Sequence, residues 1–197
     1  MNRRIQQIDE GIFTISNVFS PAECQAEIDR AEQIGFESAT VRTDNGSMMM
    51  QRIRNNDRVV LEDLELANVL WDRIRTSLPT LDFSVACGVD KQLRFYRYVP
   101  GQQFKRHKDG AVTNELGQTT KLSYLIYLND DFQGGTTTFR DYVQIDGLQN
   151  KIEFSFTPII GSALLFRHER WHEGMPVLAG KKYVLRSDVF YQQIGDE

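Results

Sequence analysis

The sequence predicts a mainly β fold with flanking α, in which an antiparallel barrel or jelly roll is buttressed by N-terminal helices. From about residue 81, short segments rich in β-branched and aromatic residues alternate with Gly, Asn and Asp turn signals, a pattern typical of such barrels. Earlier in the chain, two longer segments carry apolar residues at helical spacing. The length of 197 residues suits one domain. We expect residues 1–80 to form a mostly helical buttress and residues 81–197 to form the jelly-roll core.

The first helix has clear start and stop signals. Ser20 can cap it, Pro21 suits its first position, and Glu23 completes a capping box with Ser20. Gly35 is a typical residue to end it. The other elements predicted in this half are two strands, a loop and a second helix, at residues 11–18, 39–42, 44–50 and 62–78.

A polar, arginine-rich segment lies between the two predicted helices, at residues 51–58. Arginine and asparagine side chains can together fix polar or acidic groups of a ligand. Arg54, Asn56 and Arg58 are therefore candidates for the wall of a binding site. A solvated connector is the alternative interpretation of the same residues.

Eight short strands are predicted in the second half, separated by turns such as Pro100-Gly101, Gly134-Gly135 and Asp146-Gly147. They are residues 81–87, 92–98, 103–109, 121–128, 136–140, 152–157, 162–167 and 182–191. A barrel built from such strands has a mouth where inward side chains of several strands converge. We therefore look for functional residues near the strand ends.

The composition is that of an ordinary globular protein. The hydrophobic fraction of 41% and the charged fraction of 25% are typical, and the net charge of −4 favours neither nucleic acid nor a membrane as partner. The two cysteines lack metal or disulfide spacing and fit a reducing compartment. The start of the chain lacks the apolar core of a signal peptide, and no apolar run is long enough to span a membrane. A cytoplasmic location is therefore expected.

The triplet His107-Lys108-Asp109 ends one of the predicted strands. Residues two apart on a strand point to the same face, so the His107 imidazole and the Asp109 carboxylate are expected to project together. They supply two of the three ligands of the 2-His-1-carboxylate triad that holds non-haem Fe(II). A surface ion pair is the alternative for an isolated His-x-Asp pattern.

The third ligand has few candidates, because the chain has only three histidines. His172 follows the predicted strand at residues 162–167, and so could complete the triad from a facing strand. His168 lies nearer that strand and is the competing candidate. The residues alone leave both histidines open as the ligand.

Lys182 lies ten residues after His172 and opens a predicted strand on which it shares a face with Arg186. A lysine that points into a barrel is costly unless it meets an anion. A dicarboxylate cosubstrate that chelates the iron would supply this anion, and only one of the two cations can anchor the same carboxylate. An exposed lysine at the start of the strand is the alternative.

Four ordered segments carry motifs that occur together in one family. They are Tyr98–Asp109 with Tyr, Pro-Gly-Gln, an aromatic residue and His-x-Asp, Tyr124–Phe139 with Tyr-Leu-Asn and Gly-Gly-x-Thr-x-Phe, Gly161–Phe166, and His172–Lys182 with His-Glu-Gly-x-Pro-Val. In these motifs the chain resembles the Fe(II)/2-oxoglutarate-dependent dioxygenases, in particular their prolyl 4-hydroxylase-like branch. The resemblance covers most of the chain and includes the helix start at Phe19–Cys24.

The resemblance implies a double-stranded β-helix fold in a single dioxygenase domain. The implied iron ligands and catalytic residues are His107, Asp109 and His172. His172 is favoured over His168 because the Gly-x-Pro-Val tail follows it. The residues implied to bind the cosubstrate are Lys182, Tyr98 and Thr137. The implied cofactors are Fe(II), 2-oxoglutarate and O2, with ascorbate as an additional candidate.

The implied activity is hydroxylation of an unactivated C–H bond, with decarboxylation of 2-oxoglutarate to succinate and CO2. Where protein prolyl hydroxylases tend to carry Arg-Thr-Ser, this chain has Arg54-Asn55-Asn56. The substrate therefore stays open between a prolyl or other protein side chain, a free amino acid and another small molecule. The candidates to hold it are Arg54, Asn56, Arg58, Arg140 and Trp171, with the polar loop at residues 110–120 as a lid.

Two other functions are compatible with the same residues. A zinc-dependent hydrolase could use the two histidines and the aspartate to hold a metal-bound water, but Lys182 and Tyr98 would then have no task. A non-catalytic metal-binding jelly-roll module is the second alternative. Such a module would be expected to have lost a ligand or the lysine, whereas this chain retains all of them.

Overall fold

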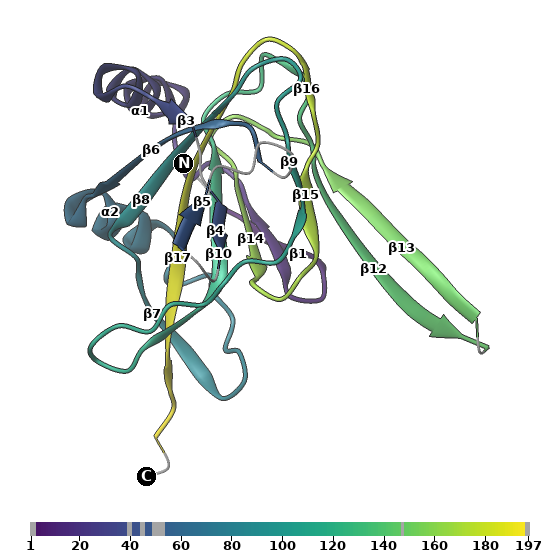
Figure 1. Ribbon diagram of the computed structural model, residues 1–197. Coiled ribbons are helices and arrows are strands. Elements are labelled where there is room, and N and C mark those ends of the chain that lie inside the picture. The colour runs from purple at the N-terminus through teal and green to yellow at the C-terminus, as the bar shows by residue number, and fades with distance from the viewer. Residues whose placement is uncertain (1–2, 39–40, 44–45, 49–53, 147, 196–197) are drawn as a thin grey trace.

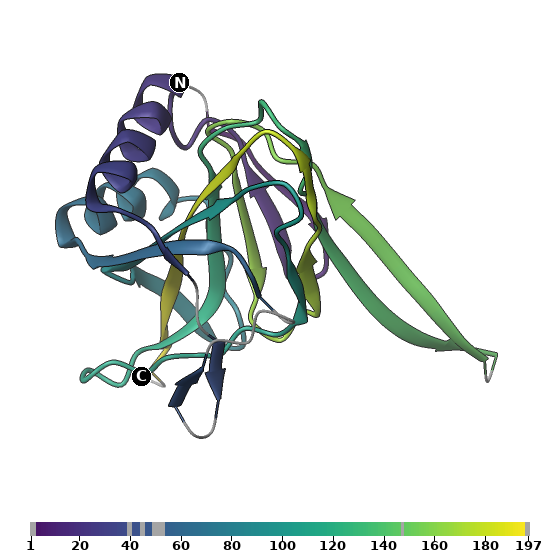
Figure 2. The ribbon, with the colours of Figure 1, turned by 45° about the horizontal axis from the view of Figure 1, so that its top comes forward.

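The structure is an antiparallel jelly-roll barrel with helices on one flank. The computed structural model describes residues 3–38, 41–43, 46–48, 54–146 and 148–195. Within them the chain is mainly β, with one nine-stranded sheet, one four-stranded sheet and two small two-stranded sheets. Figures 1 and 2 show the helices on one side of the barrel and a long hairpin that projects from the other. The predicted fold class is therefore confirmed.

Helix α1 (Pro21–Ile34) has the predicted capping. Ser20 accepts a hydrogen bond from the Glu23 backbone, and the Glu23 carboxylate accepts one from the Ser20 backbone, which completes the capping box. Gly35 follows the helix with a φ of 93°, a value that glycine adopts without steric cost. No helix in the described part of the chain is long and apolar enough to cross a membrane.

The N-terminal eighty residues are not mostly helical, contrary to the prediction. Helix α2 (Leu64–Ile74) starts after its cap Asp63 and is shorter than the predicted helix at residues 62–78. The strands of this half are β1 (Ile5–Asp9), β2 (Ile12–Ile15), β3 (Glu37–Ser38), β4 (Val41–Thr43), β5 (Gly46–Met48) and β6 (Asp57–Glu62). Four of them, β1, β2, β3 and β6, join the nine-stranded sheet, so this half builds part of the barrel wall. The predictions for residues 39–40, 44–45 and 49–53 lie outside the described residues.

The large sheet has the order β1-β2-β14-β10-β17-β8-β6-β3, and β7 also pairs with β17. Its other strands are β7 (Ser84–Val89), β8 (Gln92–Tyr98), β10 (Thr119–Tyr127), β14 (Ala163–Arg167) and β17 (Lys182–Gln193). β17 lies between β10 and β8, with Lys182 opposite Tyr98 and Val184 opposite Tyr127. Side chains on the inner face of this central strand are therefore surrounded by protein.

The small sheet has the order β13-β12-β15-β9. Its strands are β9 (Phe104–His107), β12 (Thr137–Ile145), β13 (Leu148–Phe156) and β15 (His172–Gly174), and a separate pair is formed by β11 (Gln133–Gly134) and β16 (Val177–Ala179). β11, β15 and β16 were not predicted, because two or three residues are too few to give a recognisable alternation. β12 and β13 continue past the predicted ranges as the projecting hairpin of Figure 1.

The apolar core has two parts. In one cluster, residues of both sheets pack together, including Ile12, Tyr127, Phe139, Phe166 and Val184. The Phe139 and Phe166 rings meet edge to face with centroids 5.1 Å apart. A second cluster joins residues of both helices to the large sheet, including Cys24, Ala31, Leu70, Ile74 and Leu185. The helices thus support the large sheet. The first cluster fills the space between the two sheets, where the candidate site also lies.

Candidate active site

His107 and His172 lie side by side because their strands are neighbours in the small sheet. His107 is the last residue of β9, His172 is the first residue of β15, and the two are paired in register. Their ring centroids are 4.2 Å apart. Phe104 stacks on His107 with centroids 3.5 Å apart, and Phe166 contacts the His172 ring at 4.4 Å. Apolar rings therefore limit the orientations that both imidazoles can adopt.

Asp109 lies beside the two histidines, but its backbone is not part of a strand. β9 ends at His107, so the prediction of a strand over residues 103–109, with both side chains on one strand face, is wrong. The Asp109 backbone N–H instead donates to the His168 carbonyl at 3.0 Å. Ligand atoms of His107, Asp109 and His172 all lie within 4.8 Å of one another. The structure thus gathers the three predicted ligands, although not by the predicted route.

Both imidazoles present Nε2 to this cluster. Nδ1 of His107 is 2.7 Å from the Lys105 carbonyl, and Nδ1 of His172 is 3.0 Å from the Arg170 carbonyl. A carbonyl can only accept, so Nδ1 carries the proton in each ring and the Nε2 lone pair is free. Each Nε2 lies 3.6 Å from an oxygen of Asp109. Two imidazole nitrogens and one carboxylate form the donor set of a non-haem Fe(II) site.

Burial and neighbouring charge keep His172 and Asp109 in the form that binds a metal. Burial lowers the pKa of His172 to about 4, so its imidazole is neutral near neutral pH. Burial would raise the pKa of Asp109, but Arg186 and then the two imidazoles hold it well below its usual value. Arg186 Nη1 lies 2.9 Å from Asp109 Oδ1. Metal ligation requires a neutral imidazole and an ionised carboxylate, and both are present without a further proton transfer.

A cavity opens on the three residues. Strands of both sheets line it. The lining residues are Tyr96, Tyr98, Phe104, His107, Asp109, Leu125, Thr137, His172, Gly174, Lys182, Val184 and Arg186. All three predicted cosubstrate-binding residues are among them.

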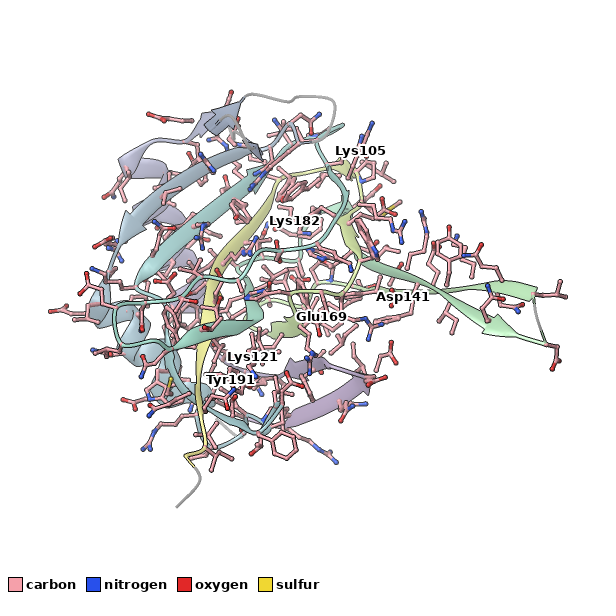
Figure 3. The ribbon with its side chains drawn as sticks, turned by 60° about the horizontal axis from the view of Figure 1, so that its bottom comes forward. Lys105, Lys121, Asp141, Glu169, Lys182 and Tyr191 are labelled. Atoms are coloured by element: carbon pink, nitrogen blue, oxygen red, sulfur yellow. The ribbon has the colours of Figure 1, made fainter. Side chains whose placement is uncertain are left out.

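Lys182 is a buried cation in this cavity, with 4% of its surface exposed. It opens β17, at the centre of the molecule in Figure 3. Its Nζ donates to the Gly135 carbonyl at 2.6 Å and lies 5.4 and 5.3 Å from the ring centroids of Tyr98 and Tyr127. Burial alone lowers the pKa of Lys182 to about 7, with no carboxylate of the described chain to offset it. A buried ammonium without a counter-ion is costly, so the cavity favours an anionic ligand.

The Gly134-Gly135 turn makes room for this lysine. Both glycines have positive φ, 73° and 63°. A Cβ on Gly135 would lie 3.2 Å from Cδ of Lys182, and a Cβ on Gly134 would lie 2.5 Å from the Pro176 carbonyl oxygen. Because neither position tolerates a side chain, the two glycines allow the turn that aims the Gly135 carbonyl at Lys182.

Three of the predicted substrate residues, Arg54, Asn56 and Arg58, lie near the lining residue Tyr96 but do not themselves line the cavity. The Arg54 guanidinium lies over the Tyr96 and Phe104 rings, 4.3 and 4.5 Å from their centroids. Its Nε donates to Asn56 Oδ1 at 2.7 Å, whereas its buried Nη2 has no hydrogen-bond partner among the described residues. Arg58 is paired with Tyr96 across β6 and β8. Arg54 therefore has an N–H group that is not used in a hydrogen bond with the described residues.

The other two predicted substrate residues, Arg140 and Trp171, do not line the cavity either. Arg140 forms ion pairs with Glu153 at 2.6 Å and Glu173 at 3.1 Å. Trp171 is 37% exposed, and the Arg106 guanidinium lies over its ring, 4.5 Å from the ring centroid. The segment at residues 110–120, predicted as a lid, contributes none of the described lining residues.

Three contacts at the site were not predicted from the sequence. The Ser123 hydroxyl donates to Asp109 Oδ2 at 2.5 Å, and His168 Nδ1 lies 2.9 Å from Ser123 Oγ. His168 is therefore placed behind the carboxylate and not in the metal-ligating group. The hydroxyls of Tyr127 and Thr137 also share a hydrogen bond of 2.7 Å. Strand periodicity could have put Ser123 and Tyr127 on one face of β10, but it carries no information about what that face contacts.

A comparison with protein families identifies the class of the protein. The family model of the 2OG-Fe(II) oxygenase superfamily matches residues 93–187, a range that contains His107, Asp109, His172 and Lys182. Over this range the chain is similar to the 2OG-Fe(II) oxygenase superfamily. The predicted class of enzyme, a 2-oxoglutarate-dependent Fe(II) oxygenase, is thereby confirmed.

The oxygenase is similar to proteins named as prolyl hydroxylases. A putative prolyl 4-hydroxylase of Acanthamoeba polyphaga mimivirus is 24% identical to it over 181 residues, which are 87% of this chain and 71% of the relative. The sequence resemblance to the prolyl 4-hydroxylase-like branch is thus confirmed. This likeness complements the family match, which is confined to the second half of the chain.

Solved structures of prolyl hydroxylases share the fold of this oxygenase. One is a prolyl hydroxylase from Trichoplax adhaerens in complex with a hypoxia inducible factor peptide fragment. Its TM-score is 0.69 at 21% identity, and the match covers 91% of this chain and 83% of the Trichoplax chain. The viral collagen prolyl hydroxylase of Paramecium Bursaria Chlorella virus-1 has a TM-score of 0.59 at 19% identity, with coverages of 91% and 96%. A Pseudomonas putida prolyl-4-hydroxylase has a TM-score of 0.61 at 20% identity, with coverages of 90% and 91%. The double-stranded β-helix fold is therefore confirmed.

Proposed function

We propose that this oxygenase uses Fe(II), 2-oxoglutarate and O2 to hydroxylate an unactivated C–H bond of a prolyl residue in a polypeptide. One observation carries the proposal: a group of two histidines and one carboxylate shares a cavity with a buried lysine that has no counter-ion among the described residues. The similar proteins named as prolyl hydroxylases support the choice of substrate, and one of them is in complex with a peptide.

His107, Asp109 and His172 would hold the iron. Their donor atoms fit Fe(II) by type and number, and Asp109 and His172 are held in the protonation states that a metal requires. When bound, Fe(II) and 2-oxoglutarate supply the oxidising chemistry, in which 2-oxoglutarate is decarboxylated to succinate and CO2. The residues of the chain orient the reactants, and the apolar rings against the two imidazoles restrict access of water to this side of the site.

Lys182 would bind the distal carboxylate of 2-oxoglutarate. Tyr98 and Thr137 line the same cavity, and their hydroxyls can donate further hydrogen bonds to a carboxylate. Arg186 is the other buried cation of the cavity, but it is paired with Asp109 at 2.9 Å and with Asp188 at 3.2 Å. The cation without a counter-ion is therefore the better anchor for an incoming dianion.

The affinity for 2-oxoglutarate is expected to fall as the pH rises above about 7. In the free protein the pKa of Lys182 is about 7, so the side chain is charged below this pH and neutral above it. Only the charged form attracts a carboxylate, and a bound carboxylate raises the pKa again. The Kd should therefore increase by up to about tenfold per pH unit between the two pKa values. Calorimetric titration of the iron-loaded protein without oxygen measures it, and a Kd that is constant from about pH 6 to pH 9 would contradict it.

Arg54 would hold the polypeptide. A buried guanidinium with a free N–H can donate to a backbone carbonyl of the substrate. Asn56 fixes the orientation of this guanidinium by accepting from Nε. Arg58, on the strand next to Tyr96, adds positive charge on the same side. We therefore place the substrate over the wall formed by Tyr96 and Phe104, next to the metal ligands.

The proposed function is tested by formation of succinate. Wild-type protein with Fe(II) and 2-oxoglutarate should form succinate faster when a proline-containing peptide is added, and mass spectrometry should find one added oxygen on the peptide. In the same assay, Arg54→Ala should raise the KM for the peptide by about 10- to 100-fold, as for loss of a charged hydrogen bond, without changing the Kd for 2-oxoglutarate.

Arg140→Ala is the matched control, because Arg140 pairs with Glu153 and Glu173 outside the cavity, and it should behave as the wild type. Stimulation by free L-proline or another amino acid but by no peptide would contradict the polypeptide substrate. Absence of succinate with every candidate substrate would contradict the proposed reaction itself.

A further inference from the structure

A buried chain of hydrogen bonds ends on Asp109. Its members are Thr120 and Ser123 on β10 and His168, which follows β14, and all three are buried. Thr120 Oγ1 lies 3.0 Å from His168 Nε2, His168 Nδ1 lies 2.9 Å from Ser123 Oγ, and Ser123 Oγ lies 2.5 Å from Asp109 Oδ2. The chain therefore runs through four side chains from the start of β10 to the carboxylate.

The direction of these hydrogen bonds follows from the number of protons available. Ser123 has one hydroxyl hydrogen, and an ionised carboxylate can only accept, so Ser123 donates to Asp109. His168 Nδ1 must then be the donor to Ser123 Oγ. In the neutral ring Nε2 is left as the acceptor, which takes the Thr120 hydroxyl hydrogen. Each member thus donates towards Asp109, an arrangement in which successive hydrogen bonds strengthen one another.

Asp109 needs such support more than the two histidines do. His107 and His172 are fixed by strand pairing and by aromatic neighbours, since Phe104 stacks on His107 and Phe166 packs at a tilt against His172. Asp109 lies beyond the end of β9, and one backbone hydrogen bond ties it to the His168 carbonyl. The orientation of its carboxylate therefore depends on the side chains that donate hydrogen bonds to it. Ser123 is an uncharged donor, whereas Arg186 is a charged one.

We propose that Ser123 and His168 are positioning residues for the Asp109 carboxylate, and that His168 acts only through Ser123. The proposal rests on the metal site proposed above. A carboxylate that is already held in one orientation loses no rotational freedom when it binds a metal. Groups that orient metal ligands in this way commonly contribute about 10- to 100-fold to metal affinity.

The test is a double-mutant cycle on Fe(II) affinity, measured without oxygen by equilibrium dialysis of the full chain. Ser123→Ala and His168→Ala should each weaken Fe(II) binding by about tenfold or more, and the double variant should be no weaker than Ser123→Ala alone. Ser187→Ala is the matched control, because Ser187 is equally buried on β17 and donates to the Asp90 carbonyl. Thermal unfolding of each metal-free variant confirms that it is folded.

Two further variants probe which ring nitrogen matters. His168→Asn keeps an N–H donor at the same number of bonds from Cα as Nδ1, and it should restore most of the affinity that His168→Ala loses. His168→Gln places its amide where Nε2 lies, and it should not. Wild-type affinity in Ser123→Ala, or effects of the two single variants that add in the double variant, would overturn the positioning role while leaving the metal site intact. A wild-type protein that binds no Fe(II) would overturn the metal site as well.

Discussion

Replacement of His172 by alanine is expected to abolish Fe(II) binding. The His172 imidazole is a buried member of the ligand group, with Nε2 at 3.6 Å from Asp109 Oδ2. Alanine leaves two donors in a site enclosed by Phe139 and Phe166, where a water has few polar partners to hold it in the vacant position. Loss of a direct ligand should exceed the effect of losing a supporting group, so we expect Fe(II) affinity to fall by more than about 100-fold.

The measurement is anaerobic addition of Fe(II) and then 2-oxoglutarate, followed by the visible metal-to-ligand charge-transfer band. The band should form in the wild type and be absent in His172→Ala. His168→Asn is the informative comparison, because His168 is the other histidine of this part of the chain but lies outside the ligand group. A band that survives in His172→Ala and disappears in His168→Asn would reverse the assignment of the ligand.

Replacement of Lys182 by methionine is expected to separate cosubstrate binding from metal binding. The ammonium is buried without a counter-ion, and no described iron-ligand candidate contacts it. Removing one partner of a buried charge pair typically costs several kcal/mol, so the Kd for 2-oxoglutarate should rise by about 100-fold or more. The Kd for Fe(II) should stay within about twofold of the wild type, because residues that share no partners contribute independently.

The same variant should be more stable than the wild type when no cosubstrate is present. Burial lowers the pKa of Lys182 to about 7, which means that the folded state binds this proton less well than the unfolded state does. The wild type therefore loses stability as the pH falls from the usual lysine pKa towards 7, and Lys182→Met removes this loss. Thermal unfolding near pH 7 measures the difference between the two proteins.

Lys181→Met is the matched control for both measurements, because Lys181 is the adjacent residue and its side chain is exposed. It should change neither the Kd for 2-oxoglutarate nor the midpoint of unfolding. Unchanged 2-oxoglutarate affinity in Lys182→Met would contradict the assignment of the anchor. It would direct attention to Arg186 as the remaining cation of the cavity.

Much of the fold could be read from local patterns. The capping residues Ser20 and Glu23 are a local signal, and helix α1 begins where they predict. The helical share of the first eighty residues was overestimated, because β1 and β6 are short and show their role only through pairing: β1 pairs with β2, and β6 pairs with β8 of the second half. β15 was missed for the same reason, although it carries His172. Strand pairing joins residues that are far apart in the chain, and a local pattern does not contain that information.

The site shows the same division. Few histidines and a lysine at a fixed spacing were enough to make His107, His172 and Lys182 candidates, because each side chain has few structural reasons to be buried. The residues alone left His168 open beside His172, and the resemblance to a known family chose between them. Arg140 and Trp171 were also named, but their polar or aromatic character is satisfied by partners on the surface. Residue type alone does not distinguish a surface ion pair from a binding contact.

The sequence by itself determined the chemistry of this protein: which side chains can ligate a metal, which cation can anchor an acid, and the β-rich texture that brings them together. Only the tertiary structure decided how Asp109 is held, since its position depends on the His168 carbonyl, the Ser123 hydroxyl and Arg186. The physical reason is that donor types are properties of single residues. Their distances and burial, in contrast, arise from packing between strands that are remote in the chain.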